Sequence, residues 1–250
     1  MAAEVSLLSW NVFNENLDAG RIAACLEAHN ADVALLQEMT PDHIEAARSI
    51  YPHVEIAVDY LLNGEACHLA IASRFPLADV RVVEHFPRDK PAPTWLSRKM
   101  GWTEFLESLS AEIEPAPGWR LRLIVAHTSA AIGPTARMAE TEAVAAAHIP
   151  EAGPCVFAAD FNSLAKPWNA PLLALPLQYR QADFLVNERS KLEAWFGRQG
   201  FEPAARGVTY PRLLAQLDQI YVRGARVTSS AIPKDRHGSD HRPLVATLAA

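Results

Sequence analysis

The chain has 250 residues, of which 50% are hydrophobic and 21% are charged, so it can bury a large core. Its 23 basic and 29 acidic side chains give a net charge of −6, which argues against a protein that holds long nucleic acid mainly through its phosphates. Neither a secretion signal nor a membrane-spanning apolar run is visible, so we expect a cytoplasmic protein with no membrane span and no obligate protein partner.

The three cysteines predict neither a disulfide framework nor a zinc site. Cys25, Cys67 and Cys155 are far apart, odd in number and surrounded by apolar residues, with no Cys-x-x-Cys spacing. We expect them to be reduced thiols in the core.

The N-terminal part of the chain predicts two buried strands that each end on a polar side chain. Residues 5–12 form an apolar run that ends near Asn11, and residues 31–39 form another that ends near Glu38. The helices expected here follow the candidate caps Asp18 and Thr40, over residues 21–29 and from Pro41 to about residue 50.

The middle of the chain predicts a series of strands interrupted by one proline-rich segment. The strands are expected over residues 54–58, 67–73, 78–85, 109–114 and 121–126, and the last of them leads to His127. The segment of residues 86–102 mixes basic side chains with Trp95 and Trp102 and is expected to be a loop. This composition suits contacts with phosphates and aromatic rings. A solvent-exposed loop anchored by its two tryptophans explains it equally well.

The C-terminal part again places ionisable residues beside apolar strands. The expected elements are a helix from residue 135 to before Pro150, a strand over 155–159, loop and short helix over 166–181, a helix over 192–199, and strands over 217–222, 225–232 and 244–248. Asp160 and Asn162 follow the strand over residues 155–159, and Asp218 lies near the start of the strand over 217–222. Asp240 and His241 precede the last strand. No repeat or linker divides the chain, so residues 1–250 are expected to form one domain.

One arrangement recurs at six places, where an apolar strand brings a polar or ionisable residue to its end. Each residue alone is more often a turn, a cap or a satisfied structural side chain. If none of these residues had a shared role, six unrelated polar side chains would have to lie at strand ends by chance. The pattern therefore favours one shared site. The residues are Asn11, Glu38, His127, Asp160 with Asn162, Asp218, and Asp240 with His241.

The carboxylates in this set suit a hard divalent cation. Glu38 and Asp240 offer oxygen ligands of the kind that Mg²⁺ or Mn²⁺ takes, whereas the cysteines are not arranged for zinc. Bound magnesium polarises a phosphoryl oxygen and offsets charge on a leaving oxygen.

The remaining residue types fit phosphoester hydrolysis. Asp160 could activate a water molecule, while Asn11 and Asn162 could donate hydrogen bonds to phosphate oxygens. His241 would stabilise the developing negative charge, and a buried Asp218 would fix its tautomer.

The order of these motifs resembles the endonuclease/exonuclease/phosphatase superfamily, also called the DNase I-like fold. The motifs are Trp10-Asn11-Val12, Leu36-Gln37-Glu38, His127-Thr128, Asp160-Phe161-Asn162, Leu217-Asp218-Gln219-Ile220 and Ser239-Asp240-His241-Arg242-Pro243. The resemblance implies an α/β four-layer sandwich, with two mixed, mostly antiparallel β-sheets packed face to face and helices outside. It also implies a magnesium site at one edge.

Several roles come from this resemblance alone. His127 would flank the scissile phosphate opposite His241, Asn11 would lie near the metal, and Arg74 would belong to the phosphate-binding pattern. Two positions depart from the family, because Ala159 replaces a usual glycine before Asp-Phe-Asn and Ala126 replaces a polar neighbour of the histidine.

The leading hypothesis is a magnesium-dependent phosphodiesterase or phosphatase acting on small or lipid-like phosphoesters, with Mn²⁺ as a possible substitute. A DNA or RNA endonuclease or exonuclease of the same superfamily is the alternative, because fold does not choose the substrate. A non-catalytic binding or scaffold protein is the alternative from another class, and it would be expected to have lost part of the residue set.

Overall fold

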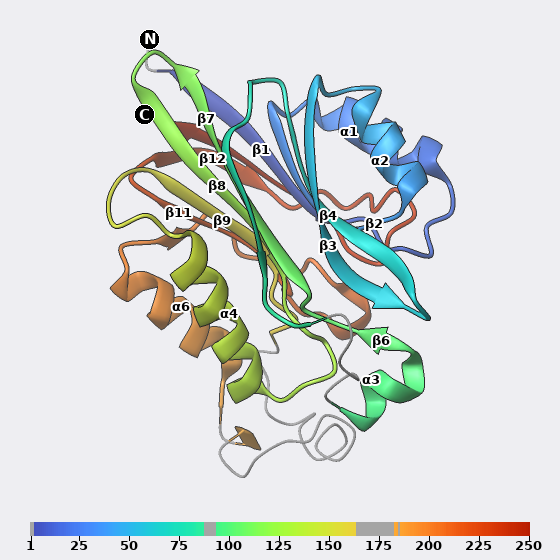
Figure 1. Cartoon of the computed structure of the whole chain (residues 1–250). Helices are drawn as coiled ribbons and strands as arrows, with labels where there is room; N and C mark the ends of the chain where they lie inside the picture. Colours follow the sequence, from blue (N-terminus) through green and yellow to red (C-terminus); the bar gives the residue numbers. More distant parts are fainter. Residues whose placement is uncertain (1–2, 88–93, 164–182, 185) are drawn as a thin grey trace.

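The computed structural model describes residues 3–87, 94–163, 183–184 and 186–250, which form two mixed β-sheets packed face to face (Figure 1). In spatial order, the seven-stranded sheet consists of β12 (Arg226–Ala231), β13 (Leu244–Ala249), β1 (Glu4–Asn11), β2 (Val33–Met39), β4 (Glu65–Ser73), β3 (His53–Leu62) and β6 (Trp102–Thr103). The six-stranded sheet consists of β10 (Glu202–Pro203), β11 (Asp218–Arg223), β9 (Cys155–Asp160), β8 (Trp119–His127), β7 (Glu107–Ala116) and β5 (Ala78–Glu84).

Helices cover the outer faces of both sheets, which makes four layers (Figure 1). Helices α1 (Ala19–His29) and α2 (Pro41–Arg48) pack on the seven-stranded sheet, and α4 (Pro134–His148) and α6 (Glu188–Arg198) pack on the six-stranded sheet. Helix α3 (Trp95–Met100) adjoins β6, and a short 3₁₀ helix covers Pro211–Leu213. The predicted α/β sandwich is confirmed.

The central strands are apolar on both faces because each face meets a different layer. On β1, Val5 and Leu7 belong to the core between the sheets, whereas Leu8 and Trp10 belong to the core under α1 and α2. A strand buried on both sides has continuous rather than alternating hydrophobicity. Continuous apolar runs therefore predicted these strands in the sequence.

Two parallel strand pairs fix the position of the strand-end residues. In the seven-stranded sheet β1 runs parallel to β2 and pairs Asn11 with Gln37. In the six-stranded sheet β8 runs parallel to β9 and pairs His127 with Asp160. Because parallel strands end at the same edge, each pair presents two polar side chains together.

The predicted helix caps are confirmed, and one predicted loop is partly helical. Asp18 accepts a hydrogen bond from Gly20 N at 3.0 Å, and Thr40 accepts one from His43 N at 3.4 Å. Helix α2 ends at Arg48, two residues earlier than expected. The expected loop of residues 86–102 contains helix α3, which is capped by Thr94, and part of it (88–93) lies outside the described residues, as does 166–181. No described helix is long and apolar enough to span a bilayer.

Candidate active site

The two parallel strand pairs bring Asn11, Glu38 and Asp160 into contact. Asn11 Nδ2 donates to Glu38 Oε1 at 2.7 Å and to Asp160 Oδ2 at 3.0 Å. Glu38 reaches this position through a β-bulge, since the β2–β4 register shifts between Leu36 and Met39 and Glu38 adopts a positive φ of 58°. The bulge interrupts the alternation of side chains along β2, so the Glu38 carboxylate lies toward the strand ends.

Glu38 lies in an environment that suits a bound cation. Tyr60 donates its hydroxyl to Glu38 Oε2 at 3.2 Å, and Asn14 N lies 3.2 Å from the same oxygen. Burial is the main cause that raises the pKa of Glu38, and it outweighs the nearby His127 and the Asn11 hydrogen bond. A half-buried carboxylate whose pKa is raised, beside an amide and further carboxylates, is the oxygen-rich donor set that Mg²⁺ takes.

His127 is held by a carboxylate from the opposite sheet. Its Nδ1 lies 3.0 Å from Oδ2 of Asp59 on β3, and that same oxygen accepts from Glu38 N at 3.1 Å. On its other side, Nε2 lies 3.0 Å from Nδ2 of Asn162 and 3.8 Å from Oδ2 of Asp160. Burial lowers the pKa of His127, but the Asp59 and Asp160 carboxylates outweigh it and hold that pKa well above its ordinary value.

His241 forms a second pair of the same kind. Its Nδ1 lies 2.8 Å from Oδ2 of Asp218, and its Nε2 lies 3.6 Å from Oδ2 of Asp160. Burial lowers the pKa of His241, whereas Asp218 and then Asp160 raise it, and the result is about 10. Burial raises the pKa of Asp160, yet the two imidazoles outweigh it and hold that pKa below its ordinary value.

Both pairs cross the space between the sheets and converge on one oxygen. His127 on β8 meets Asp59 from the seven-stranded sheet, and His241, just before β13, meets Asp218 from the six-stranded sheet. The Nε2 atoms of both histidines face Oδ2 of Asp160. A carboxylate flanked by two imidazoles is suited to exchange protons with a reacting group in neutral solution.

Asn162 reaches the site from a turn and not from the strand itself. Strand β9 ends at Asp160, and Asn162 has a positive φ of 48°. Asn162 N donates to Asp160 Oδ1 at 2.9 Å, so the two residues form an Asx turn that also serves the site.

Asp240 lines the same cavity but carries a partner that was not foreseen. Its Oδ2 lies 3.3 Å from an exposed guanidinium, that of Arg212, and its Oδ1 lies 3.9 Å from Nε2 of His241. Asp240 therefore lies beside His241, in the lining of the cavity that Glu38 also lines.

Arg74 is not brought to the site. It follows β4 at the end where Ser73 pairs with Val33, the far end of β2 from Glu38. Its guanidinium contacts Asn30 and the carbonyl oxygen of Ala31. The phosphate-binding role suggested for Arg74 by the resemblance has no geometric support here.

Asp59 and Tyr60 are site residues that the sequence interpretation missed. The predicted strand stopped at residue 58, whereas β3 continues to Leu62 with Asp59 buried in its interior. Asp59 follows the predicted strand of residues 54–58, but nothing local in the sequence shows that it stays buried inside a longer strand.

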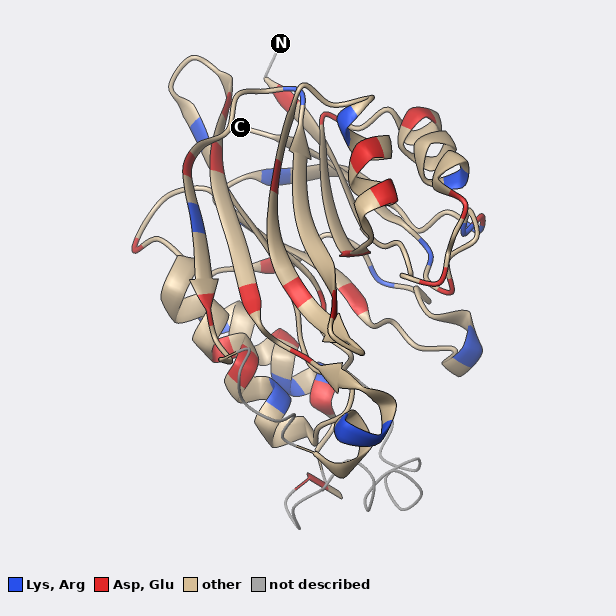
Figure 2. Cartoon of the chain, turned by 45° about the vertical axis from the view of Figure 1, so that its right-hand side comes forward, with Lys and Arg blue, Asp and Glu red and all other residues tan. Residues whose placement is uncertain are grey.

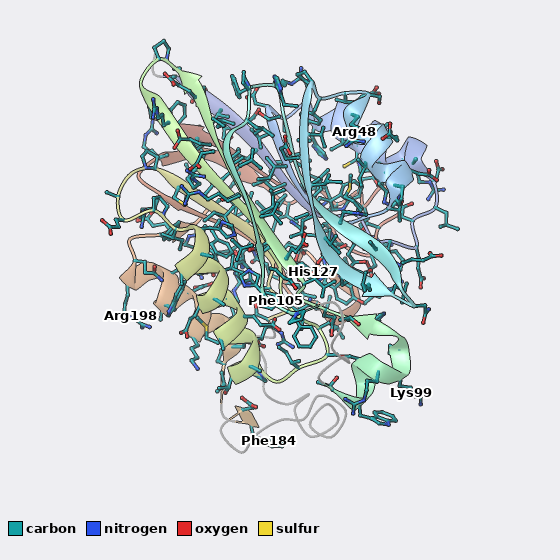
Figure 3. The ribbon with its side chains drawn as sticks, in the orientation of Figure 1. Arg48, Lys99, Phe105, His127, Phe184 and Arg198 are labelled. Carbon is teal, nitrogen blue, oxygen red and sulfur yellow. The ribbon has the colours of Figure 1, made fainter. Side chains whose placement is uncertain are left out.

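The polar cluster forms one wall of a 460 Å³ cavity, and the rest of the lining is mostly apolar and aromatic but includes Glu15, Glu104 and Arg137. Leu96 and Met100 of α3 contribute to this lining, together with Trp102, Phe105 and Leu213. Figure 3 shows His127 and Phe105 close together near the ends of the strands, between the sheets and α3. The predicted loop of residues 86–102 therefore supplies part of the cavity wall.

Solved structures with this fold include several phosphoester-cleaving proteins. An endonuclease/exonuclease/phosphatase from Beutenbergia cavernae aligns over 99% of this chain and 72% of its own, with 17% identity and a TM-score of 0.73. ANGEL2, described as a 2′,3′-cyclic phosphatase, aligns over 99% and 96%, with 16% identity and a TM-score of 0.65. D. rerio TDP2 in complex with a single-stranded DNA product aligns over 99% and 100%, with 16% identity and a TM-score of 0.64.

No curated protein matches the chain. The model of the Endonuclease/Exonuclease/phosphatase family, in contrast, matches residues 8–241, a span that runs from β1 to His241 and contains Glu38, His127 and Asp160. The match and the shared fold agree with the motif order from which the resemblance was drawn, and this chain belongs to the endonuclease/exonuclease/phosphatase family.

Proposed function

We propose that the protein is a magnesium-dependent phosphoester hydrolase. The observation that carries this proposal is the convergence of two buried Asp–His pairs on Asp160, next to the Asn11–Glu38 contact. Family membership agrees with phosphoester hydrolysis in general terms, while the metal, the residue roles and the substrate are inferred from the chain's own residues.

The proposed magnesium ligands are Glu38, Asn11 and Asp240. Glu38 is the main one, because its carboxylate is half-buried and has only neutral donors, from Asn11, Tyr60 and Asn14, within hydrogen-bond distance. Magnesium keeps several waters and needs few protein carboxylates, so this small oxygen set is sufficient, and Mn²⁺ can substitute. When bound, the ion would offset the negative charge that develops on the phosphoryl and leaving oxygens.

The proton transfers are assigned to the residues around Asp160. Asp160 accepts a proton from the attacking water, and Asn162 donates a hydrogen bond to a phosphate oxygen. His127, protonated and backed by Asp59, gives its proton to the leaving oxygen when the phosphorus–oxygen bond breaks. His241, backed by Asp218, stabilises the negative charge on the phosphate oxygens.

The cavity favours small or lipid-like phosphoesters over long nucleic acid. Its apolar and aromatic wall suits a substrate with an apolar or ring-shaped group beside the phosphate. Among the described residues that line it, Arg137 is the one arginine or lysine, and its guanidinium is paired with Glu188. Figure 2 shows acidic positions on the central strands and basic positions mostly toward the periphery. Single-stranded or cyclic nucleotide ends remain in the tested set because TDP2 and ANGEL2 share the fold.

A substrate panel tests the proposed reaction. Bis-aryl phosphates, inositol phosphates, abasic, nicked and single-stranded DNA, RNA, and 2′,3′-cyclic nucleotide ends are each incubated with and without EDTA, using wild type and Asp160→Asn. We expect at least one phosphoester to be cleaved, with loss of activity in EDTA and in the variant. If no substrate is cleaved above the Asp160→Asn level, the alternative of a non-catalytic binding protein is favoured.

Glu38→Gln tests the ligand role separately. The variant keeps the side-chain shape but weakens cation binding, so we expect it to be inactive at ordinary magnesium and partly restored at high magnesium. Asp42→Asn, a charge removal at an exposed position on α2, is the matched control. An unchanged magnesium requirement in Glu38→Gln would contradict the assignment.

The cytoplasmic location stays a prediction.

A further inference from the structure

A second cluster of metal-binding side chains lies outside the cavity, between α1 and the loop that precedes β13. Cys25 and His29 are four residues apart on α1 and therefore lie on the same face of the helix. His237 joins them from the loop after β12, and ligand atoms of the three residues all lie within 4.8 Å of one another. None of these residues takes part in the proposed hydrolysis.

The cluster contains a nitrogen that the rest of the fold leaves unsatisfied. Nε2 of His29 is buried and has no hydrogen-bond partner among the described residues. Its ring meets that of His237 edge-on, with 6.0 Å between ring centroids, while Nε2 of His237 lies 3.9 Å from a carboxylate oxygen of the exposed Asp235. A buried imidazole nitrogen without a partner is costly, and a bound metal would remove that cost.

We propose that Cys25, His29 and His237 bind a Zn²⁺ ion. One thiolate and two imidazoles are ligands that zinc prefers, and water or Asp235 can complete a tetrahedral set. Zinc–ligand bonds of 2.0–2.3 Å place tetrahedral donor atoms about 3.6 Å apart, so the three side chains need to close by about an ångström. On binding, the Cys25 S–H bond breaks, its sulfur bonds to zinc, and the proton passes to the buffer.

Cysteine spacing had argued against zinc because no two cysteines are close in the sequence. The site proposed here needs only one cysteine, and its histidines come from positions 208 residues apart. The two sites bind different cations because their ligands differ. Magnesium favours the oxygen ligands of the cavity, and zinc favours the thiolate and imidazoles of the second cluster.

The zinc ligand His237 lies on the segment that positions Asp240 and His241. Asn16 Nδ2 donates to the carbonyl oxygen of His237 at 3.1 Å, and two residues further Ser239 donates to the carbonyl oxygen of Asn11 at 2.8 Å. Ser239 Oγ also accepts from His241 N at 2.9 Å. An ion that ties His237 to α1 would therefore restrain the loop that carries part of the catalytic cluster.

Cobalt substitution tests the site without any activity assay. The full-length protein, stripped of metal and kept reduced, is titrated with Co²⁺ in excess Mg²⁺, which occupies the oxygen site. We expect one equivalent of Co²⁺ to give a thiolate-to-cobalt charge-transfer band and tetrahedral d–d absorption, both removed by one equivalent of Zn²⁺. The same zinc addition should raise the Tm.

Two variants and two controls identify the ligands. Cys25→Ser should lose the charge-transfer band, and His237→Asn should lose tetrahedral cobalt binding while keeping the fold, because Asn tolerates the positive φ of 46° at that position. Cys155→Ser and Cys67→Ser change other buried cysteines and should keep the band. Absence of the band in wild type, its survival in Cys25→Ser, or its loss only in Cys67→Ser would overturn the proposal.

Discussion

Replacing Asp218 with Asn isolates the contribution of one buried charge to the site. Asp218 is fully buried and lies 2.8 Å from Nδ1 of His241. Two unit charges at that distance attract by about 6 kcal/mol at an effective dielectric constant of about 20. Asn keeps the shape and can still accept a hydrogen bond through Oδ1. If that neutral contact retains half of the attraction, the charged imidazole loses about 3 kcal/mol of stabilisation.

A loss of about 3 kcal/mol in the transition state corresponds to a decrease in kcat of about 100-fold. We expect KM to change by less than about threefold, because Asp218 does not line the cavity and acts through His241. The assay is steady-state hydrolysis of the best substrate in the panel, with Tm measured by circular dichroism on the same samples. Asp42→Asn is the control for removing one carboxylate.

The reasoning is refuted if Asp218→Asn folds with an unchanged Tm and retains a kcat within threefold of wild type. In that case His241 would not depend on the charge of its partner. A large rise in KM with unchanged kcat would also contradict it, because that pattern indicates lost substrate binding rather than lost transition-state stabilisation.

Three further predictions concern stability and metal affinity. Burial lowers the pKa of His148 to about 4, so below pH 6.5 the unfolded chain binds a proton that the folded chain does not. The free energy of unfolding should fall by about 3 kcal/mol from pH 6.5 to 4 in urea titrations, and less in His148→Gln. Gly238→Ala should lower stability by at least about 1–2 kcal/mol, read as a lower urea midpoint, because φ is 92° and the new Cβ would lie 2.5 Å from Asn16 Oδ1. Tyr60→Phe should raise the magnesium concentration for half-maximal activity about tenfold, because it removes the donor to Glu38.

The strand-end residues could be predicted because apolar runs show where buried strands stop. Strands β1, β2 and β9 are apolar on both faces. Asn11, Glu38 and Asp160 can therefore be recognised as polar side chains at or next to the last residue of each strand. The parallel pairing that brings these ends together is not encoded in any one segment. The resemblance implied mixed, mostly antiparallel sheets, and the strand registers show that β1–β2 and β8–β9 are the pairs that run parallel.

Asp59 shows why the rest of the site could not be predicted in the same way. A carboxylate inside a strand normally indicates exposure or the end of the strand, because burying an unpaired charge is costly. Asp59 stays buried because His127, 68 residues later, supplies its partner from the other sheet. Local periodicity holds no information about such a distant partner, and the predicted strand therefore stopped at residue 58, four residues before the end of β3.

The two Asp–His pairs link the packing of the sheets to the chemistry of the site. Each pair takes its histidine from one sheet and its carboxylate from the other, so neither pair exists until the sheets have met. Each charge is then desolvated, and its partner offsets the cost together with Asp160, which faces both imidazoles. Removing a carboxylate leaves a buried imidazole unpaired and should reduce both activity and stability. A variant that loses activity alone therefore points to the half-buried Asn162 rather than to Asp59, Asp160 or Asp218.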